Sequence, residues 1–166
     1  MLTYVTPDKN EPHLLEYAIS LASKLEAHLE GVVFTFLPEL SGIYATMPDD
    51  FYTRVQKQSE AAAENARLDF RRRASTASIH HAVRSYTATA NEAEPLFGRA
   101  ARCFDLAIVP QTNPENAAFF NPTFEDVMFL SGRPTLFVPT IQKGPAAVNR
   151  VLLCWNGDRW AARAAA

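Results

Sequence analysis

The sequence predicts a doubly wound α/β domain built on a five-stranded parallel sheet. Short apolar runs alternate five times along the chain with segments of helical periodicity. The runs are rich in β-branched and aromatic residues and are apolar throughout, which is typical of strands that are buried on both faces. Their connections are short, and this favours right-handed strand–helix–strand units with helices on both sides of the sheet.

The composition is that of a globular protein with a core of ordinary size. The chain has 166 residues, of which 48% are hydrophobic and 20% charged, and its formal net charge is −2. This balance gives no electrostatic footprint for nucleic acid or for an anionic membrane. No apolar run approaches the roughly 20 residues of a membrane helix, and the first residues lack the features of a signal peptide. We therefore expect a soluble cytoplasmic protein.

The first half of the chain predicts two strands and two helices. The strands are expected at 2–6 and 31–37. Asn10 is expected to cap the first helix, whose apolar positions begin at Leu14. A long second helix should begin at Asp49 or Asp50 and reach about Ala74. Three arginines at 71–73 fall in its last turns, where they favour the helix dipole, so we assign them a structural role rather than anion binding.

The second half predicts three strands and two helices. The strand at 79–87 is the most polar and is therefore expected at an edge of the sheet. Asn91 should cap the next helix, with Glu94 three residues on as its capping partner. A strand at 106–110, a helix at 122–131 ended by Gly132, and a strand at 135–138 complete the unit.

Residues with reactive side chains form no recognisable catalytic or metal-binding pattern. Cys103 and Cys154 lie far apart in apolar surroundings and are expected to be buried free thiols. His80 and His81 are adjacent, so on a strand they face opposite sides and cannot share a metal. The chain has neither a Gly-x-Ser-x-Gly elbow nor a Gly-x-Gly-x-x-Gly fingerprint. We therefore expect no enzymatic activity.

The end of the chain repeats its beginning at an offset of 150 positions. Leu152–Asp158 aligns with Leu2–Asp8, and each segment predicts a strand, a turn that ends in Asp, and a helix. The residues between them, 140–149, have the composition of a linker. We therefore expect one domain at 1–139, a linker at 140–149, and the truncated start of a second, similar domain at 150–166.

These segments resemble the universal stress protein family in its tandem-domain form. The resemblance is carried by the helix Leu14–Ala22, the fourth strand, the ending Ser131–Pro139 and the second start Val151–Arg163. It implies a Rossmann-like sheet with strand order 3-2-1-4-5 and a role in the stress response. It also implies that two domains pair through their last strands. The partner of the strand Thr135–Val138 would be the second domain of the same full-length chain or a second copy.

The resemblance also identifies where a nucleotide would bind. Nucleotide-binding members carry an Asp at the end of strand one and a Gly-x2-Gly-x9-Gly-Ser/Thr loop after strand four, and the loop backbone wraps the phosphates. The corresponding positions in this chain are Thr6, Pro110, Gln111, Asn121 and Thr123. Thr6 replaces the Asp, residues 111–121 contain no glycine, and Pro122, at the Ser/Thr position, offers neither an N–H nor a hydroxyl.

Three functions follow from this pattern. The first is a non-enzymatic interaction domain of the stress response that needs no cofactor and does not bind ATP in this half. The second is an adenine-nucleotide (ATP or AMP) binding domain with weak or no ATPase activity. The third is a pocket for a small apolar or carbonyl metabolite. Its lining would come from aromatic side chains for which core packing is the favoured role: Phe34, Phe36, Phe119, Phe120 and Phe124.

Overall fold

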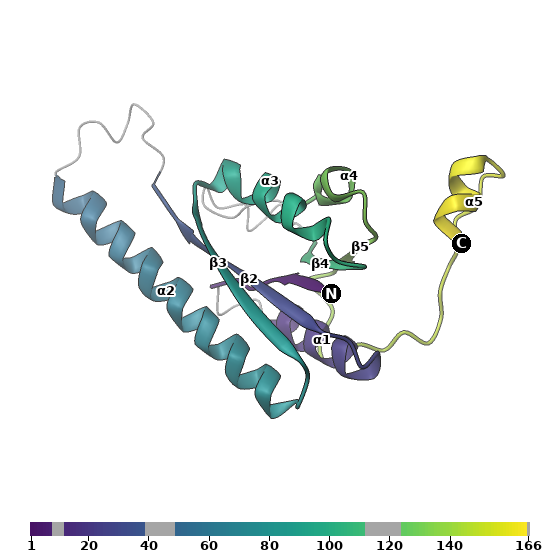
Figure 1. Ribbon diagram of the computed structural model, residues 1–166, viewed down its shortest axis with the longest axis horizontal. Coiled ribbons are helices and arrows are strands. Elements are labelled where there is room, and N and C mark those ends of the chain that lie inside the picture. Colours follow the sequence, from purple (N-terminus) through teal and green to yellow (C-terminus); the bar gives the residue numbers. More distant parts are fainter. Residues whose placement is uncertain (8–11, 39–48, 112–123, 166) are drawn as a thin grey trace.

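The computed structural model describes residues 1–7, 12–38, 49–111 and 124–165. It confirms a sheet of five parallel strands in the order β3-β2-β1-β4-β5 (Figure 1). The polar strand expected at an edge is indeed the edge strand β3. Along the chain the elements are β1 (Leu2–Tyr4), α1 (Pro12–Lys24), β2 (Leu29–Phe36), α2 (Asp49–Thr76), β3 (His81–Ala88), α3 (Ala90–Ala101), β4 (Ala107–Pro110), α4 (Val127–Ser131), β5 (Thr135–Val138) and α5 (Arg159–Ala165).

Helices cover both faces of the sheet. α1 and α2 lie on one face and α3 and α4 on the other (Figure 1). Successive side chains of β1 and of Val5, which follows it, pack on opposite faces of the sheet. The Tyr4 ring lies 4.6 Å from the Phe124 ring, beside α4. The Val5 side chain and the Phe70 ring of α2 both crowd the space around Gly31 on the opposite face. The core is therefore split into two layers, as a doubly wound fold requires.

Several element boundaries differ from those that the sequence predicts. β2 spans Leu29–Phe36 rather than 31–37, and β3 spans His81–Ala88 rather than 79–87. Two further differences lie near the carboxyl edge of the sheet. β1 ends at Tyr4 rather than Thr6, although the Val5 N–H still donates to the Val32 carbonyl at 2.8 Å. α4 begins at Val127, whereas a helix from 122 was expected. Phe124 precedes this helix and is 1% exposed, and its carbonyl accepts a hydrogen bond from the Val127 N–H at 3.3 Å. Residues 122 and 123 lie outside the described residues, as does the expected cap Asn10.

The cap of α3 lies two residues earlier than predicted. Thr89, not Asn91, is the N-cap, because β3 continues through Ala88 and the helix begins directly afterwards. The Glu92 carboxylate accepts hydrogen bonds from the Thr89 N–H at 2.9 Å and from the Thr89 hydroxyl at 3.0 Å. These bonds lower the pKa of Glu92. Glu94, which was expected to complete the cap, is therefore available for another contact.

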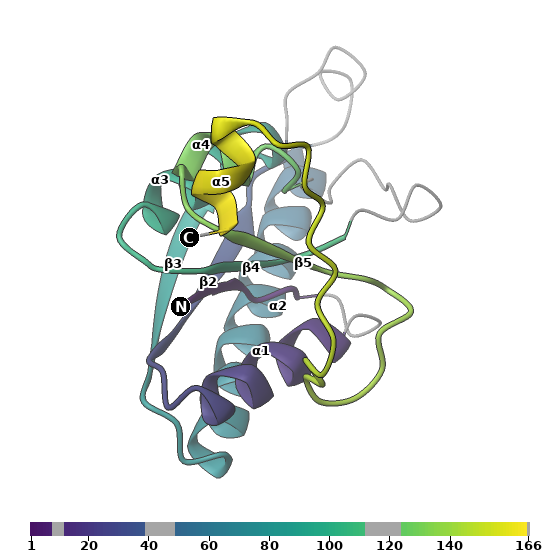
Figure 2. The ribbon, with the colours of Figure 1, turned by 90° about the vertical axis from the view of Figure 1, so that its right-hand side faces the viewer.

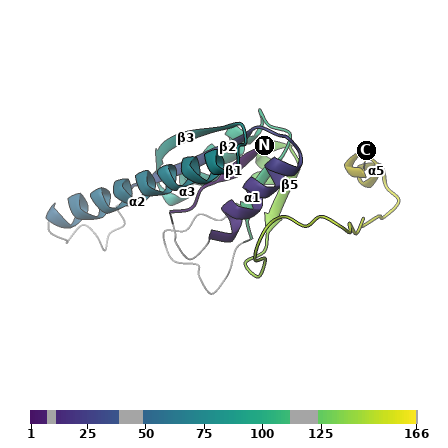
Figure 3. The ribbon, with the colours of Figure 1, turned by 90° about the horizontal axis from the view of Figure 1, so that it is seen from below.

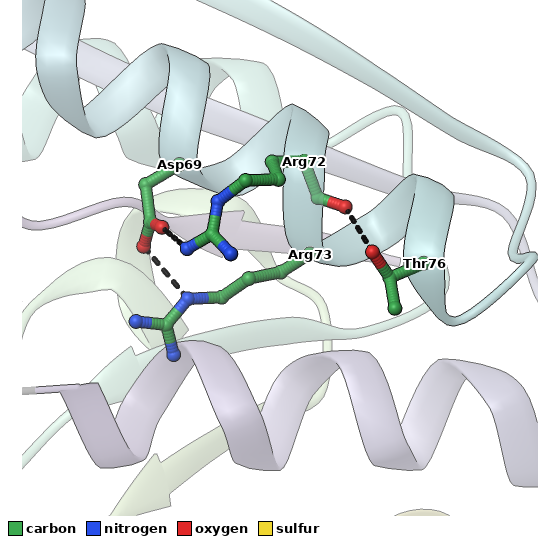
Figure 4. A network of polar contacts seen from close by, with 4 residues as sticks. All are labelled: Asp69, Arg72, Arg73 and Thr76. Atoms are coloured by element: carbon green, nitrogen blue, oxygen red, sulfur yellow. Dashed lines mark hydrogen bonds and ion pairs between the residues drawn. The ribbon is translucent and has the colours of Figure 1, made fainter.

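Two of the three arginines at the end of α2 form ion pairs within that helix. Arg73 Nε lies 2.7 Å from an Asp69 carboxylate oxygen, and Arg72 pairs with the other oxygen (Figure 4). The Thr76 hydroxyl donates to the Arg72 carbonyl at 2.9 Å in the same group. All of these contacts lie within one helix, so the charges of this segment are largely used to stabilise its last turns.

Both cysteines are exposed, which corrects the expectation that they are buried. Cys103 follows the end of α3 at Ala101 and faces solvent. Cys154 lies in the segment 150–155, which is irregular rather than a strand. A strand needs a neighbouring strand to satisfy its backbone, and this segment runs away from the sheet toward α5 (Figures 1 and 3). The expected second domain therefore stays a prediction.

Candidate functional site

The most suitable place for a ligand is the edge of the sheet where the chain changes direction. From β1 the chain moves outward through β2 to β3, and α3 then carries it back to β4 on the other side of β1. Ligands of open α/β sheets bind beyond the carboxyl ends of the strands at such a switch point. Here that point lies between β1 and β4. The Thr3 hydroxyl donates to the Ile108 carbonyl at 3.2 Å and ties the two strands together.

The sheet brings three of the five predicted site residues to this edge. β1 and β4 run in register with Leu2 beside Ala107, so Thr6, two residues after β1, shares the carboxyl edge with Pro110 and Gln111. Gln111 is exposed, and its N–H donates to the Val138 carbonyl of β5 at 2.9 Å. Asn121 and Thr123 lie outside the described residues, so the grouping of all five is not tested.

Carboxylates surround the start of α4 on the same side of the fold. Glu94 of α3 accepts a hydrogen bond from the Asp126 N–H at 2.8 Å. Burial raises the pKa of Glu94, and the negative charges of Asp126 and Glu125 raise it further, while the hydrogen bond opposes the shift. The Asp126 N–H thus already has the Glu94 carboxylate as its acceptor, and the carboxylates of Glu125 and Asp126 lie nearby. A phosphate group placed here would meet charge repulsion.

A pH titration of stability can test this arrangement. The raised pKa means that the folded state holds the Glu94 proton more tightly than the unfolded chain does. The resulting stabilisation is present below the ordinary value of 4.5 and is lost as pH rises through the raised pKa. We expect Glu94→Gln to gain stability relative to the wild type as pH rises through this window, because Gln keeps an acceptor for the Asp126 N–H without the charge.

Urea unfolding at a series of pH values measures this difference. Glu16→Gln, on the exposed face of α1, is the matched control and should follow the wild-type pH dependence. Parallel curves for Glu94→Gln and the wild type would contradict the assigned role of Glu94.

Aromatic side chains fill the space beneath this edge. Ring centroids follow one another from Tyr86 to Phe34 (5.8 Å), Tyr4 (6.2 Å), Phe124 (4.6 Å) and Phe97 (5.2 Å). Of the aromatic residues that were candidates for a pocket, Phe34 and Phe124 are buried in this row. Phe36 stacks on Phe34 at 5.9 Å. These three side chains therefore serve packing, and Phe119 and Phe120 lie outside the described residues.

Within the described ranges, no three His, Cys, Asp or Glu side chains gather as metal ligands. His81 Nδ1 lies 3.0 Å from the Ile79 carbonyl, and its ring meets the edge of Phe70 at 6.0 Å, so this histidine is part of the packing under α2. None of the helices in that same part of the chain is both long and apolar enough to cross a bilayer.

Sequence reasoning did not identify the contact between Glu94 and α4. Glu94 has the spacing of a capping-box residue, so the local pattern predicted a cap. It gave no sign of the contact with Asp126, which lies 32 positions away. The one available signal was the acidic pair Glu125–Asp126, which directly precedes the apolar residues of α4.

The fold was compared with known proteins. Neither a scan against protein-family models nor a search of curated proteins finds a match. Three solved structures are similar over most of their length. A universal stress protein family member from Burkholderia pseudomallei has 18% identity and a TM-score of 0.53, covering 83% of this chain and 95% of its own. Universal stress protein UspA from Lactobacillus plantarum has 13% identity and a TM-score of 0.56, covering 83% and 97%.

The third similar structure is a universal stress protein in complex with cAMP. It has 15% identity and a TM-score of 0.51, and the match covers 84% of this chain and 97% of that one. At these identities the likeness concerns the backbone arrangement rather than the site residues. The strand order, the parallel sheet and these three matches together show that the chain has the fold of the universal stress proteins.

Proposed function

We propose that this chain is a non-enzymatic, cytoplasmic interaction domain of the stress response, and that it does not bind ATP at the edge between β1 and β4. The observation that carries the proposal is the acidic start of α4. Glu94 occupies the Asp126 N–H, and Glu125 and Asp126 add negative charge beside it. A triphosphate needs donors and positive charge at this place.

The sequence around the site supports the same conclusion. Residues 111–121 contain no glycine, so the backbone there lacks the residue type that lets N–H groups approach phosphates closely. Pro122 has no N–H to offer. Thr6 occupies the position where the family resemblance implies an adenine-contacting Asp. The loss of adenine and phosphate contacts together removes most of what would hold ATP.

A second candidate function is adenine-nucleotide binding with weak or no ATPase activity. Two observations favour it. The sheet has a switch point between β1 and β4, where α/β folds bind their ligands. One of the structurally similar universal stress proteins was solved in complex with cAMP. A cyclic monophosphate carries less charge than ATP and needs fewer phosphate donors, so it would tolerate the acidic surroundings better.

Calorimetric titration separates the two candidates. The chain is titrated with ATP, AMP and cAMP in the presence of Mg²⁺, and we expect no heat of binding at millimolar ligand. Glu94→Gln is titrated in parallel with the Glu16→Gln control. Micromolar binding by the wild type would overturn the proposal and make the chain a nucleotide sensor. Binding that appears only in Glu94→Gln would support the idea that the acidic group excludes phosphate.

The proposal includes a partner of the same fold. β5 is the edge strand next to β4, and its side chains are only partly buried at three of its four positions. An edge strand of this kind offers unpaired backbone groups to another sheet. The partner would be a second domain of the same full-length chain, beginning near Arg150, or a second copy that pairs through Thr135–Val138.

A further inference from the structure

The segment that the sequence marks as a linker is attached to α1. We call residues 140–149 the strap. Within it, the Ala146 N–H donates to the Ser20 hydroxyl at 2.6 Å, and the Ala146 carbonyl accepts a hydrogen bond from the Lys24 ammonium. The Ser20 hydroxyl in turn donates to the Tyr17 carbonyl at 2.9 Å. Ala146 itself is 1% exposed. The chain that follows β5 passes beside α1 (Figure 2). One turn of α1 therefore satisfies both backbone groups of Ala146.

These contacts distinguish the strap from a free linker. A free linker keeps its backbone groups in water, whereas Ala146 exchanges water for two side-chain partners and buries its methyl group against the core. The bond from Lys24 is charge-assisted and stronger than a neutral one. Gly144 has φ 85°, and this left-handed turn just before Ala146 suits glycine.

An apolar segment begins directly after the strap. We call residues 150–155 the arm. Leu152 is 88% exposed and Val151 82%, although side chains of this kind are usually covered. Six of the ten large apolar side chains exposed in the described part of the chain lie in the strap and the arm: Ile141, Val148, Val151, Leu152, Leu153 and Trp155. The strap thus ties the chain that leads into this apolar segment to α1.

The sequence repeat identifies the partner that would cover this surface. Leu152 aligns with Leu2 and Cys154 with Tyr4. In β1 those positions are buried between two neighbouring strands, with Leu2 0% and Tyr4 4% exposed. The arm therefore has the pattern of a central strand but no strands beside it.

We propose that the strap is held in one position on α1. It thereby sets the position of a second unit of the same fold, and the arm is the first strand of that unit. This inference rests on the two-unit organisation proposed above and adds what orients the units. The contacts of Ser20 and Lys24 with Ala146 anchor the strap four residues before the arm begins. The interface between the units then lies on the side of α1 and β5.

Amide exchange tests the anchor, and the two native cysteines test the position of the arm. In the wild type the Ala146 amide should exchange slowly, and Ser20→Ala combined with Lys24→Met should speed its exchange roughly tenfold. Spin labels on the exposed Cys103 and Cys154 report the distance from α3 to the arm. We expect a narrow distance distribution in the wild type and a broad one in the double variant. Ser23→Ala combined with Lys57→Met, at exposed positions, is the matched control and should change neither readout.

Each outcome decides part of the proposal. If the Ala146 amide of the wild type exchanged at the rate of a free peptide, the proposed anchoring of the strap to α1 would be wrong. A protected amide with a broad distance distribution, unchanged by the double variant, would overturn the positioning of the arm. Neither result depends on the nucleotide titration, so failure of the strap and failure of the proposed function are distinguishable.

Discussion

Replacing Phe124 by alanine is expected to lower the free energy of unfolding by about 3–5 kcal/mol. Phe124 is 1% exposed, and its ring lies 4.6 Å from that of Tyr4 and 5.2 Å from that of Phe97. It thus joins the last residue of β1 to α3, just before α4 begins. The cavity left by alanine would remove both ring contacts, and the short helix α4 would lose its attachment at the candidate site.

Phe129→Ala is the matched control for this substitution. Phe129 lies in α4 itself but is 76% exposed, so its truncation should change stability by no more than about 0.5 kcal/mol. Urea unfolding followed by circular dichroism measures both variants. Equal, small losses for the two phenylalanines would show that the aromatic row does not hold α4 in place.

Gly98→Ala should also destabilise the protein, by about 1–3 kcal/mol, although alanine is the better helix former. A Cβ on Gly98 would lie 2.7 Å from Leu130 Cβ, closer than real Cβ atoms approach. The clash involves a Cβ, which cannot rotate away as a side-chain tip can. α4 would have to move from α3, which also strains the hydrogen bond from Arg102 Nε to the Leu130 carbonyl at 3.1 Å.

A second substitution at Leu130 tests the cause of this loss. Leu130→Ala keeps the Cβ and should not rescue Gly98→Ala. Leu130→Gly removes it, so the Gly98→Ala change should cost less in that background, as a double-mutant cycle of unfolding free energies would show. Equal costs in the two backgrounds would mean that the loss of stability does not come from the contact between the two Cβ atoms.

Local signals in the sequence predict the regular part of this fold well. The strand at 135–138 is confirmed residue for residue, because Pro134 and Pro139 bracket it and neither can extend a sheet ladder freely. Gly132 ends α4 with φ 62°, as a C-terminal glycine should. The strand order follows from the family resemblance rather than from the periodicity.

The features that the sequence does not reveal are contacts between distant residues. Glu94 meets Asp126 across 32 positions, and Ser20 meets Ala146 across 126. No local pattern encodes such pairs, because each residue alone suits an ordinary helix surface or loop. The same reason explains the exposure of Cys154, which lies in a segment that has no neighbouring strand among the described residues.

The central place of β1 has a consequence for how the chain folds as the ribosome makes it. Leu2 pairs with Glu30 on one side and with Ala107 on the other, so one flank of β1 stays open until β4 is synthesised. β4 ends 22 residues after β3, at Pro110 against Ala88, so at ordinary translation rates the sheet of three strands waits on the order of a few seconds for β4. During this time the nascent sheet β3-β2-β1 exposes an apolar edge strand. β1 is thus the inner strand of which one edge stays unpaired longest during synthesis.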